Sequence, residues 1–440
     1  MAFDSELIGG RNKMFIERIE IENFKAISNM RIDFKPGINL LIGDNGVGKT
    51  SILDAIVVAL GGYLNGVNGV SAKNILFSDV RMETFNVGSA STSIKYYAPV
   101  KIGCELNIDN QIYEWERIRE DEAPKRNTKI VKKTGDITKY AKELTNDVFK
   151  ELPVLSYQSS IRASQTRRGD FGAEMKKKMD DRRCGYLGCL DAVLDLKRVK
   201  EWCYEMQRVS FEQNKKIDEY EQFKKIVGTV MQMMSELKEM PQVYYSRQHK
   251  DIVYLERDEI LPISCLSAGY QSVLWMIMDI AYRLATLNPG KNNLMECKGV
   301  VLIDEVDMHL HPKWQWNVVK TLEKTFPNIQ FIIATHSPII ISSCKAGNLI
   351  LIDDKQEIRY LKDAYGYSVN DVLELCQGSS DVLKNIKMLR EEFDIAITEC
   401  NYDKAVQIVN KMTEEYGTDN TEVIKVKTEL EMEQSFGEED

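Results

Sequence analysis

The sequence predicts an α/β protein built on a mainly parallel sheet, and two observations lead to this fold class. Three short apolar runs, 299–303, 329–334 and 348–353, are typical of buried strands, and helical residues 313–325 separate the first two. Strand–helix–strand alternation of this kind is the pattern of βαβ units. A fourth apolar run, 38–42, leads into a glycine-rich turn, so it belongs to the same predicted sheet.

That turn is a complete phosphate-binding loop. Residues 43–50 read GDNGVGKT, which fits G-x-x-x-x-G-K-T, and a helical segment at 51–60 follows directly. Glycines let backbone N–H groups point at phosphate oxygens, and the helix N-terminus adds partial positive charge. The alternative, a glycine-rich turn that binds nothing, explains neither the complete motif nor its context. We expect six residues to bind the nucleotide: Asn45, Gly46, Gly48, Lys49, Thr50 and Ser51.

Composition sets further limits. The 440 residues are 43% hydrophobic, which allows a real core and two or three domains. A net charge of −9 argues against a protein that coats nucleic acid with its whole surface, although a local basic patch is compatible with it. Nine cysteines are scattered singly, and neither a signal peptide nor a membrane-length apolar run is visible. These features predict reduced thiols, no membrane partner and a cytoplasmic location.

The first third of the chain also predicts an antiparallel element. Residues 14–24 and 30–34 alternate apolar and polar side chains, as half-buried strands do. Residues 93–108 and 111–118 are strand-like and are joined by a hairpin signal. The stretch 65–90 is rich in Gly, Asn and Ser, which favours a surface excursion.

The remainder alternates helical and strand patterns. A helix is expected at 136–149, a buried strand at 152–157, strands across 243–261, and a strong helix at 270–287. The end of the chain from 369 is helical and charged. The predicted parts are 14–161 and 243–362, which together form the nucleotide-binding head, a charged helical insert at 162–242, and a helical C-terminal region at 363–440.

Two carboxylates end the apolar run at 299–303. Asp304 is suited to hold Mg²⁺ through its water shell, and Thr50 of the loop is suited to ligate the same ion. Glu305 is suited to orient and deprotonate an attacking water. An Asp-Glu pair after a strand is otherwise a common turn, but the phosphate loop favours the catalytic interpretation.

Residues 266–271, LSAGYQ, precede the helix at 270–287. Ser267 could simply cap that helix. In the company of the phosphate loop, the segment resembles the Leu-Ser-Gly-Gly-Gln signature of ABC-type ATPases, from which it departs at Ala268 and Tyr270. The resemblance implies that Ser267 and Gly269 contact the γ-phosphate of a nucleotide bound to a partner subunit.

Two further residues follow strands. His336, in the segment 334–338, resembles the switch histidine of the same family, which hydrogen-bonds the γ-phosphate, although a lone histidine is often structural. Gln158, after the strand at 152–157, is the candidate for the family's glutamine, which implies contact with nucleotide and Mg²⁺.

Together these motifs resemble the RecF/SMC-like ABC ATPases over residues near 14–160 and 243–353. The strings DEVDMHLHP at 304–312 and YGYSVNDVL at 365–373 narrow the resemblance to the bacterial defence branch, including the ATPase subunits of Septu anti-phage systems and retron-associated relatives. It implies an ABC-type P-loop NTPase head that hydrolyses ATP with Mg²⁺, with Glu305 and His336 as catalytic residues. Two histidines in 308–311 could instead suggest a metal site, but a loop at a dimer interface is favoured.

The resemblance also implies partners. ATP-dependent homodimers or higher oligomers are expected, and the sequence shows neither a Toprim-like nor an HNH signature, so a separately encoded HNH nuclease is expected to cut. Basic residues in 125–142 and 162–183 could contact DNA or RNA, although such runs are usually solvated faces. Helices in 379–434 could dock a partner or cover the core. A DNA-repair or recombination ATPase that binds DNA directly stays an alternative, and a transporter motor is a weaker one.

Overall fold

The computed structural model describes ten stretches of the chain. The chain forms two compact units, one up to Tyr367 and the other from Ser368 onward. The described stretches are 13–86, 92–121, 129–134, 137–160, 181–345, 347–361, 364–377, 384–399, 401–418 and 420–437. The two units are considered separately below.

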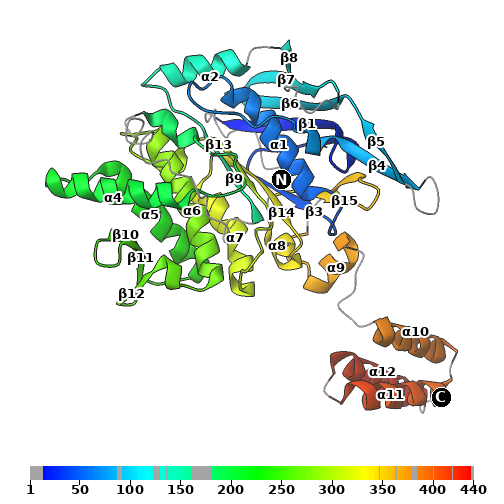
Figure 1. The fold of residues 1–440 in the computed structure, drawn as a ribbon. Helices are drawn as coiled ribbons and strands as arrows, with labels where there is room; N and C mark the ends of the chain where they lie inside the picture. The colour runs from blue at the N-terminus through cyan, green and yellow to red at the C-terminus, as the bar shows by residue number, and fades with distance from the viewer. Residues whose placement is uncertain are drawn as a thin grey trace, which may run out of the picture. The chain divides into compact units, whose positions relative to one another are not determined.

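A six-stranded sheet forms the centre of the first unit (Figure 1). Its order is β16 (Ile358–Leu361), β15 (Asn348–Ile352), β3 (Ile38–Ile42), β14 (Ile329–Thr335), β13 (Gly299–Ile303) and β9 (Val154–Gln158). All neighbours are parallel except the edge strand β16. Every residue of β3, β9, β13 and β14 is buried, as expected for a sheet covered on both faces. The mainly parallel sheet is therefore confirmed.

An antiparallel sheet forms a second layer, as the alternating N-terminal pattern predicts. Its order is β2 (Ile27–Asp33), β1 (Met14–Phe24), β6 (Val100–Ile108), β7 (Gln111–Arg119) and β8 (Lys129–Thr134). Helix α1 (Lys49–Leu64) contacts β1, β6 and β7 of this sheet and β14 of the other. Nearly all of α1 is buried, so the helix that leaves the phosphate loop is clamped between two sheets.

Helix α1 extends further than its sequence indicates. Glycines 61 and 62 are unfavourable within a helix, but here the absence of a Cβ lets the antiparallel sheet pack closely against α1. A Cβ on Gly62 would lie 2.5 Å from the indole nitrogen of Trp115, and that nitrogen donates to the carbonyl of Ala59 at 3.0 Å. Packing against β7 therefore outweighs the poor helix propensity of glycine.

One sequence-based expectation is wrong. The stretch 65–90 is not only a surface excursion, because it contains β4 (Arg81–Asn86), which pairs with β5 (Thr92–Tyr97), and buried Val67, Ile75 and Val80. Most side chains of this two-stranded ribbon are exposed, so it carries no apolar alternation by which β4 could be recognised.

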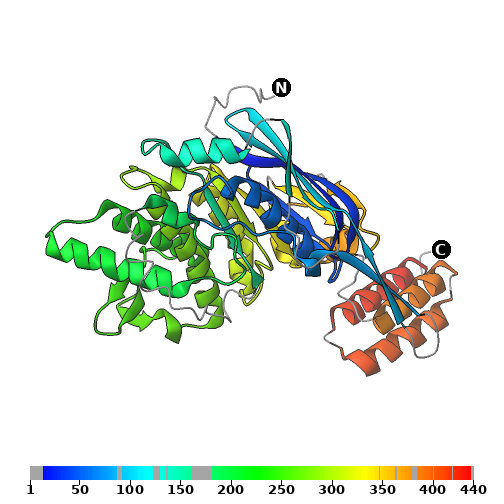
Figure 2. The same ribbon diagram turned by 45° about the horizontal axis from the view of Figure 1, so that its top comes forward.

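Helices and short strands complete the first unit. They are η1 (Phe77–Asp79), α2 (Ile137–Asn146), η3 (Arg182–Tyr186), α4 (Leu196–Glu212), α5 (Asp218–Ser235), β10 (Gln242–Ser246), β11 (Asp251–Glu256), β12 (Glu259–Pro262), η4 (Ile263–Cys265), α6 (Ala268–Leu287), η5 (Leu294–Glu296), α7 (Pro312–Thr325) and α8 (Pro338–Ser343). Figures 1 and 2 show α4, α5 and β10–β12 at the end of this unit opposite the antiparallel sheet. None of the described helices is long and apolar enough to span a bilayer. Most of the predicted basic segment 162–183, up to residue 180, lies outside the described part of the chain, as do residues 125–128 and 135–136 of the basic segment 125–142.

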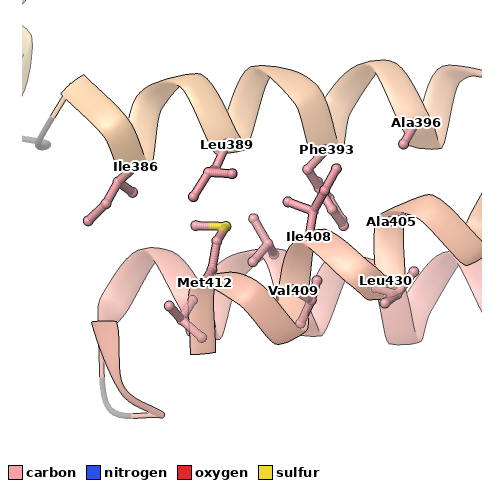
Figure 3. Close-up of a cluster of buried hydrophobic side chains, with 11 residues drawn as sticks. Ile386, Leu389, Phe393, Ala396, Ala405, Ile408, Val409, Met412 and Leu430 are labelled. Carbon is pink, nitrogen blue, oxygen red and sulfur yellow. The ribbon is translucent and has the colours of Figure 1, made fainter. Parts of the chain in front are cut away.

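The second unit is helical. It comprises α9 (Val369–Gln377), α10 (Lys384–Thr398), α11 (Tyr402–Tyr416) and α12 (Thr421–Gly437). Figure 3 shows the buried side chains by which α10, α11 and α12 meet, with Ile386, Leu389, Phe393 and Ala396 at the three-to-four spacing of an amphipathic helix. Residues 368–440 contain eighteen acidic and seven basic side chains, so the outside of this unit is strongly acidic.

Candidate nucleotide site

The phosphate loop leaves β3 and enters α1, as expected from its sequence. Gly46 and Gly48 have φ angles of +90° and +109°, which side chains with a Cβ rarely adopt. A Cβ on Gly43 would lie 2.4 Å from the carbonyl oxygen of Ile352, at the end of β15. The glycines therefore let the loop curl and pass close to the neighbouring strand.

Lys49 is the first residue of α1, at the end of this loop, and is 6% exposed. Its ammonium group donates to the carbonyl oxygens of Gly43 and Asp44, both at 2.7 Å. Burial lowers the pKa of Lys49 to about 8, although the negative charges of Asp304 and Asp44 oppose this shift. A bound phosphate would stabilise the charged form of this desolvated amine.

Thr50 and Asp304 form the part of the site suited to a metal ion. The Thr50 hydroxyl donates to the carboxylate of Asp304, at 3.0 Å from Oδ2 and 3.2 Å from Oδ1. Hydroxyl and carboxylate oxygens are the hard ligands that Mg²⁺ prefers, and Mg²⁺ usually keeps several of its waters. Thr50 is therefore suited to be a direct ligand, and Asp304, which accepts from it, is suited to hold the ion through its water shell.

Glu305 follows Asp304 with a φ of +47°, a left-handed conformation that is unfavourable for a residue with a Cβ. Strained backbone of this kind is common in active sites, where the fold holds a side chain in one place. The turn continues through a hydrogen bond from the Met308 N–H to the Glu305 carbonyl at 3.1 Å. Glu305 therefore has a left-handed backbone conformation that the preceding residue, Asp304, does not share.

His336 follows β14 and lies next to the phosphate loop. Its Nδ1 is 3.5 Å from the Nζ of Lys49. Burial is the main cause that lowers the pKa of His336, and the charge of Lys49 lowers it further. This shift favours the neutral form of the imidazole. Because an ammonium faces Nδ1, we assign the ring proton to Nε2, which can donate to an anion.

Ser267 and Gly269 lie at the start of α6. Ser267 is exposed, and its hydroxyl makes no capping hydrogen bond, so the alternative that this side chain caps the helix is wrong. A Cβ on Gly269 would lie 2.6 Å from the carbonyl oxygen of His309. Glycine is thus required here by contact with the loop at 305–311, which we term the post-Glu loop. Cross-subunit contact by Ser267 and Gly269 stays a prediction.

Gln158 lies at the carboxyl end of β9, but its side chain is turned toward α6. Its amide nitrogen donates to the Ser156 hydroxyl at 2.7 Å and to the Asp279 carboxylate at 2.9 Å. Its side-chain oxygen is buried without a hydrogen-bond partner in the described structure. The predicted contact with Mg²⁺ therefore stays a prediction, and this arrangement holds the side chain elsewhere.

The sequence did not lead us to predict the buried ion pair with which the Gln158 side chain interacts. Asp279 and Arg283 are both almost fully buried, and the guanidinium Nε donates to the carboxylate at 2.9 Å. Arg283 also donates to the Gly185 carbonyl at 2.8 Å. The available signal was an Asp and an Arg four residues apart in an otherwise apolar helix, which indicates a buried ion pair.

The family model described as an AAA domain matches residues 18–258, more than half of the chain. The chain belongs to this family of ATPases. A second AAA-domain model matches residues 193–342, so the two models together span the phosphate loop, the signature turn and the site at Asp304.

Individual relatives are distant. The chain is 26% identical to the Retron Ec83 probable ATPase of Escherichia coli, over 97% of the chain and 88% of the relative. It is 23% identical to the Septu protein PtuA of Bacillus thuringiensis, over 91% of the chain and 93% of that protein. Among solved structures, an SMC head bound to the C-terminal winged-helix domain of ScpA aligns with a TM-score of 0.48 and 16% identity, over 79% of this chain and 98% of that one.

Proposed function

We propose that the chain is the ATP-binding and ATP-hydrolysing subunit of an anti-phage defence complex. The observation that carries the ATPase chemistry is the hydrogen-bonded pair of Thr50 and Asp304, beside Lys49 and directly followed by Glu305. The similarity to retron and Septu ATPases supports the defence role.

Each residue of the site has a distinct role in this proposal. Lys49 and the backbone N–H groups of 45–51 bind the phosphates, and Thr50 with Asp304 holds Mg²⁺, which neutralises charge on the phosphate oxygens. Glu305 accepts a proton from the attacking water. His336, neutral and protonated on Nε2, donates to the γ-phosphate.

Two copies of the chain enclose two ATP molecules in this proposal. The exposed hydroxyl of Ser267 has no role in capping α6, which supports its use toward the nucleotide of a second copy. A ligand that binds only the assembled form stabilises that form by mass action. ATP would therefore hold the dimer closed until the γ-phosphate is released.

The output of the complex is cutting by a separately encoded nuclease of the HNH type. The second unit supports a docking role, because exposed Met388, Ile395 and Ile424 interrupt its acidic surface. A protein that binds nucleic acid has basic surfaces, to which such a unit is complementary.

The test uses the Glu305→Gln variant with its native operon neighbours. ATP should convert this variant to a stable dimer in light scattering while turnover falls at least 100-fold, and a nuclease should co-purify with the chain. Lys49→Ala is the control, since it should remain insensitive to ATP. Wild-type turnover by Glu305→Gln would contradict the role of Glu305, and salt-sensitive DNA binding without a nuclease would favour the DNA-repair alternative.

A further inference from the structure

The backbone that carries His336 is fixed on both sides by side chains of another segment. The Thr335 hydroxyl donates to the Asp307 carboxylate at 2.6 Å. The Ser337 hydroxyl donates to the amide oxygen of Gln315, also at 2.6 Å. Both hydroxyls belong to buried residues, while their acceptors Asp307 and Gln315 are partly exposed. The position of His336 is thus set by the post-Glu loop and the first turn of α7.

The same segment also contacts the signature turn. The centre of the Trp314 ring is 4.5 Å from the centre of the Tyr270 ring. The ring of Tyr254, which is on β11, is 5.8 Å from the Tyr270 ring. The Gly269 backbone meets the His309 carbonyl so closely that no Cβ could fit between them. A shift of the signature turn toward either neighbour would therefore press on the post-Glu loop or on Trp314.

Adjacent residues of α7 connect the two contacts. Successive side chains on an α-helix point about 100° apart, so Trp314 can face the signature turn while Gln315 faces the His336 segment. The amide nitrogen of Gln315 also donates to the Leu310 carbonyl at 2.9 Å, which ties this side chain to the post-Glu loop. Trp314 is only 7% exposed, so its ring is packed against its neighbours. The first turn of α7 is therefore in contact with the signature turn through Trp314 and with the His336 segment through Gln315.

We propose that Tyr270, Trp314 and Gln315 link the signature turn of a chain to His336 of the same chain. Gln315 is a positioning residue, because it acts on His336 through Ser337. This inference rests on the proposed ATP-dependent dimer. There, engagement of one chain's signature turn by the nucleotide of the second copy changes the placement of the first chain's own His336. The two ATP sites are thus coupled, and hydrolysis should be positively cooperative in ATP.

The first test compares ATP dependence in matched variants. Wild type should hydrolyse ATP with a Hill coefficient near 2, and both Gln315→Met and Tyr270→Leu should lower it to about 1. Tyr270→Phe keeps the ring and should retain cooperativity, whereas Gln315→Glu keeps the acceptor for Ser337 but loses the donor to Leu310 and should retain it only in part. Trp316→Leu is the control on the same helix, since Trp316 is 45% exposed. ATP-dependent dimers of Gln315→Met or Tyr270→Leu that keep wild-type cooperativity would overturn the link.

A second readout is independent of turnover. The chain has four histidines, so ¹³C labelling of histidine rings gives few signals, and His336→Asn assigns one of them. In the nucleotide-free chain, Gln315→Met should shift the His336 signal, while the exposed control Trp316→Leu should leave it unchanged. An unchanged His336 signal in a folded Gln315→Met chain would also overturn the proposal. Failure of wild type to dimerise with ATP would instead refute the proposed function on which the link depends.

Discussion

The carboxyl edge of the parallel sheet and the start of α6 differ in how much of their chemistry lies within one chain. At the sheet edge, Lys49, Thr50 and Asp304 already contact one another or the loop around them. At the start of α6, the Ser267 hydroxyl is exposed and makes no cap. The first region is complete in one copy, whereas the second offers a donor with no role inside its own helix. Substitutions in the two regions should therefore fail at different steps.

The largest effect is expected at the sheet edge. Lys49→Ala removes the only charged group that contacts the loop carbonyls of both Gly43 and Asp44 in the described structure, so ATP affinity should fall at least 100-fold. Isothermal titration with ATP and Mg²⁺ measures the loss. Lys139→Ala, at a lysine whose side chain is 70% exposed, is the control and should bind normally.

Ser267→Ala should show the opposite pattern. Affinity of the single chain for ATP should stay within about twofold, while dimerisation and turnover should drop roughly ten- to hundredfold, the range for loss of a hydrogen bond to a charged group. Equilibrium titration and light scattering separate the two steps. Ser267→Thr retains a hydroxyl and should behave like wild type. Equal loss of ATP affinity in Ser267→Ala and Lys49→Ala would contradict the assignment of Ser267 to a step after ATP binding.

Proton uptake gives a smaller but distinctive signal from the sheet edge. With a pKa of about 8, Lys49 is largely neutral in the empty site at pH 8.5, and a triphosphate should return it to the charged form. Binding at pH 8.5 should therefore take up roughly three-quarters of a proton, and at pH 7 only about a tenth. Calorimetry in buffers of different ionisation enthalpy measures this number. Comparable uptake at pH 7 and 8.5 would contradict the lowered pKa.

The smallest effect concerns the strained backbone at the same edge. Glu305→Gly should stabilise the nucleotide-free chain by about 1 kcal/mol, because glycine adopts a positive φ without a steric penalty. Urea unfolding followed by tryptophan fluorescence tests this gain. Glu305→Ala keeps the Cβ and should gain nothing, so equal stability of the two variants would show that the conformation is not strained.

The sequence predicts the sheet edge better than the surroundings that orient it. The phosphate loop and the Asp304–Glu305 pair each lie within a few residues of a buried strand, so local patterns suffice to place them. The partner of Gln158 is different, because Asp279 lies 121 residues away and on another element. The contact between Trp115 and α1, which stabilises that helix at its two glycines, also joins residues far apart in the sequence. Contacts of this kind depend on how layers pack, which no short window of sequence contains.

The desolvated amine of Lys49 has a consequence for chemical labelling. At pH 7 an amine with a pKa of about 8 is unprotonated in roughly a tenth of the molecules, compared with fewer than about one in a thousand for an ordinary lysine. Only the unprotonated form attacks acylating reagents. In the nucleotide-free protein a larger fraction of Lys49 than of an ordinary lysine is therefore unprotonated, so a small acylating reagent that reaches this buried amine should label it less once a nucleotide is bound.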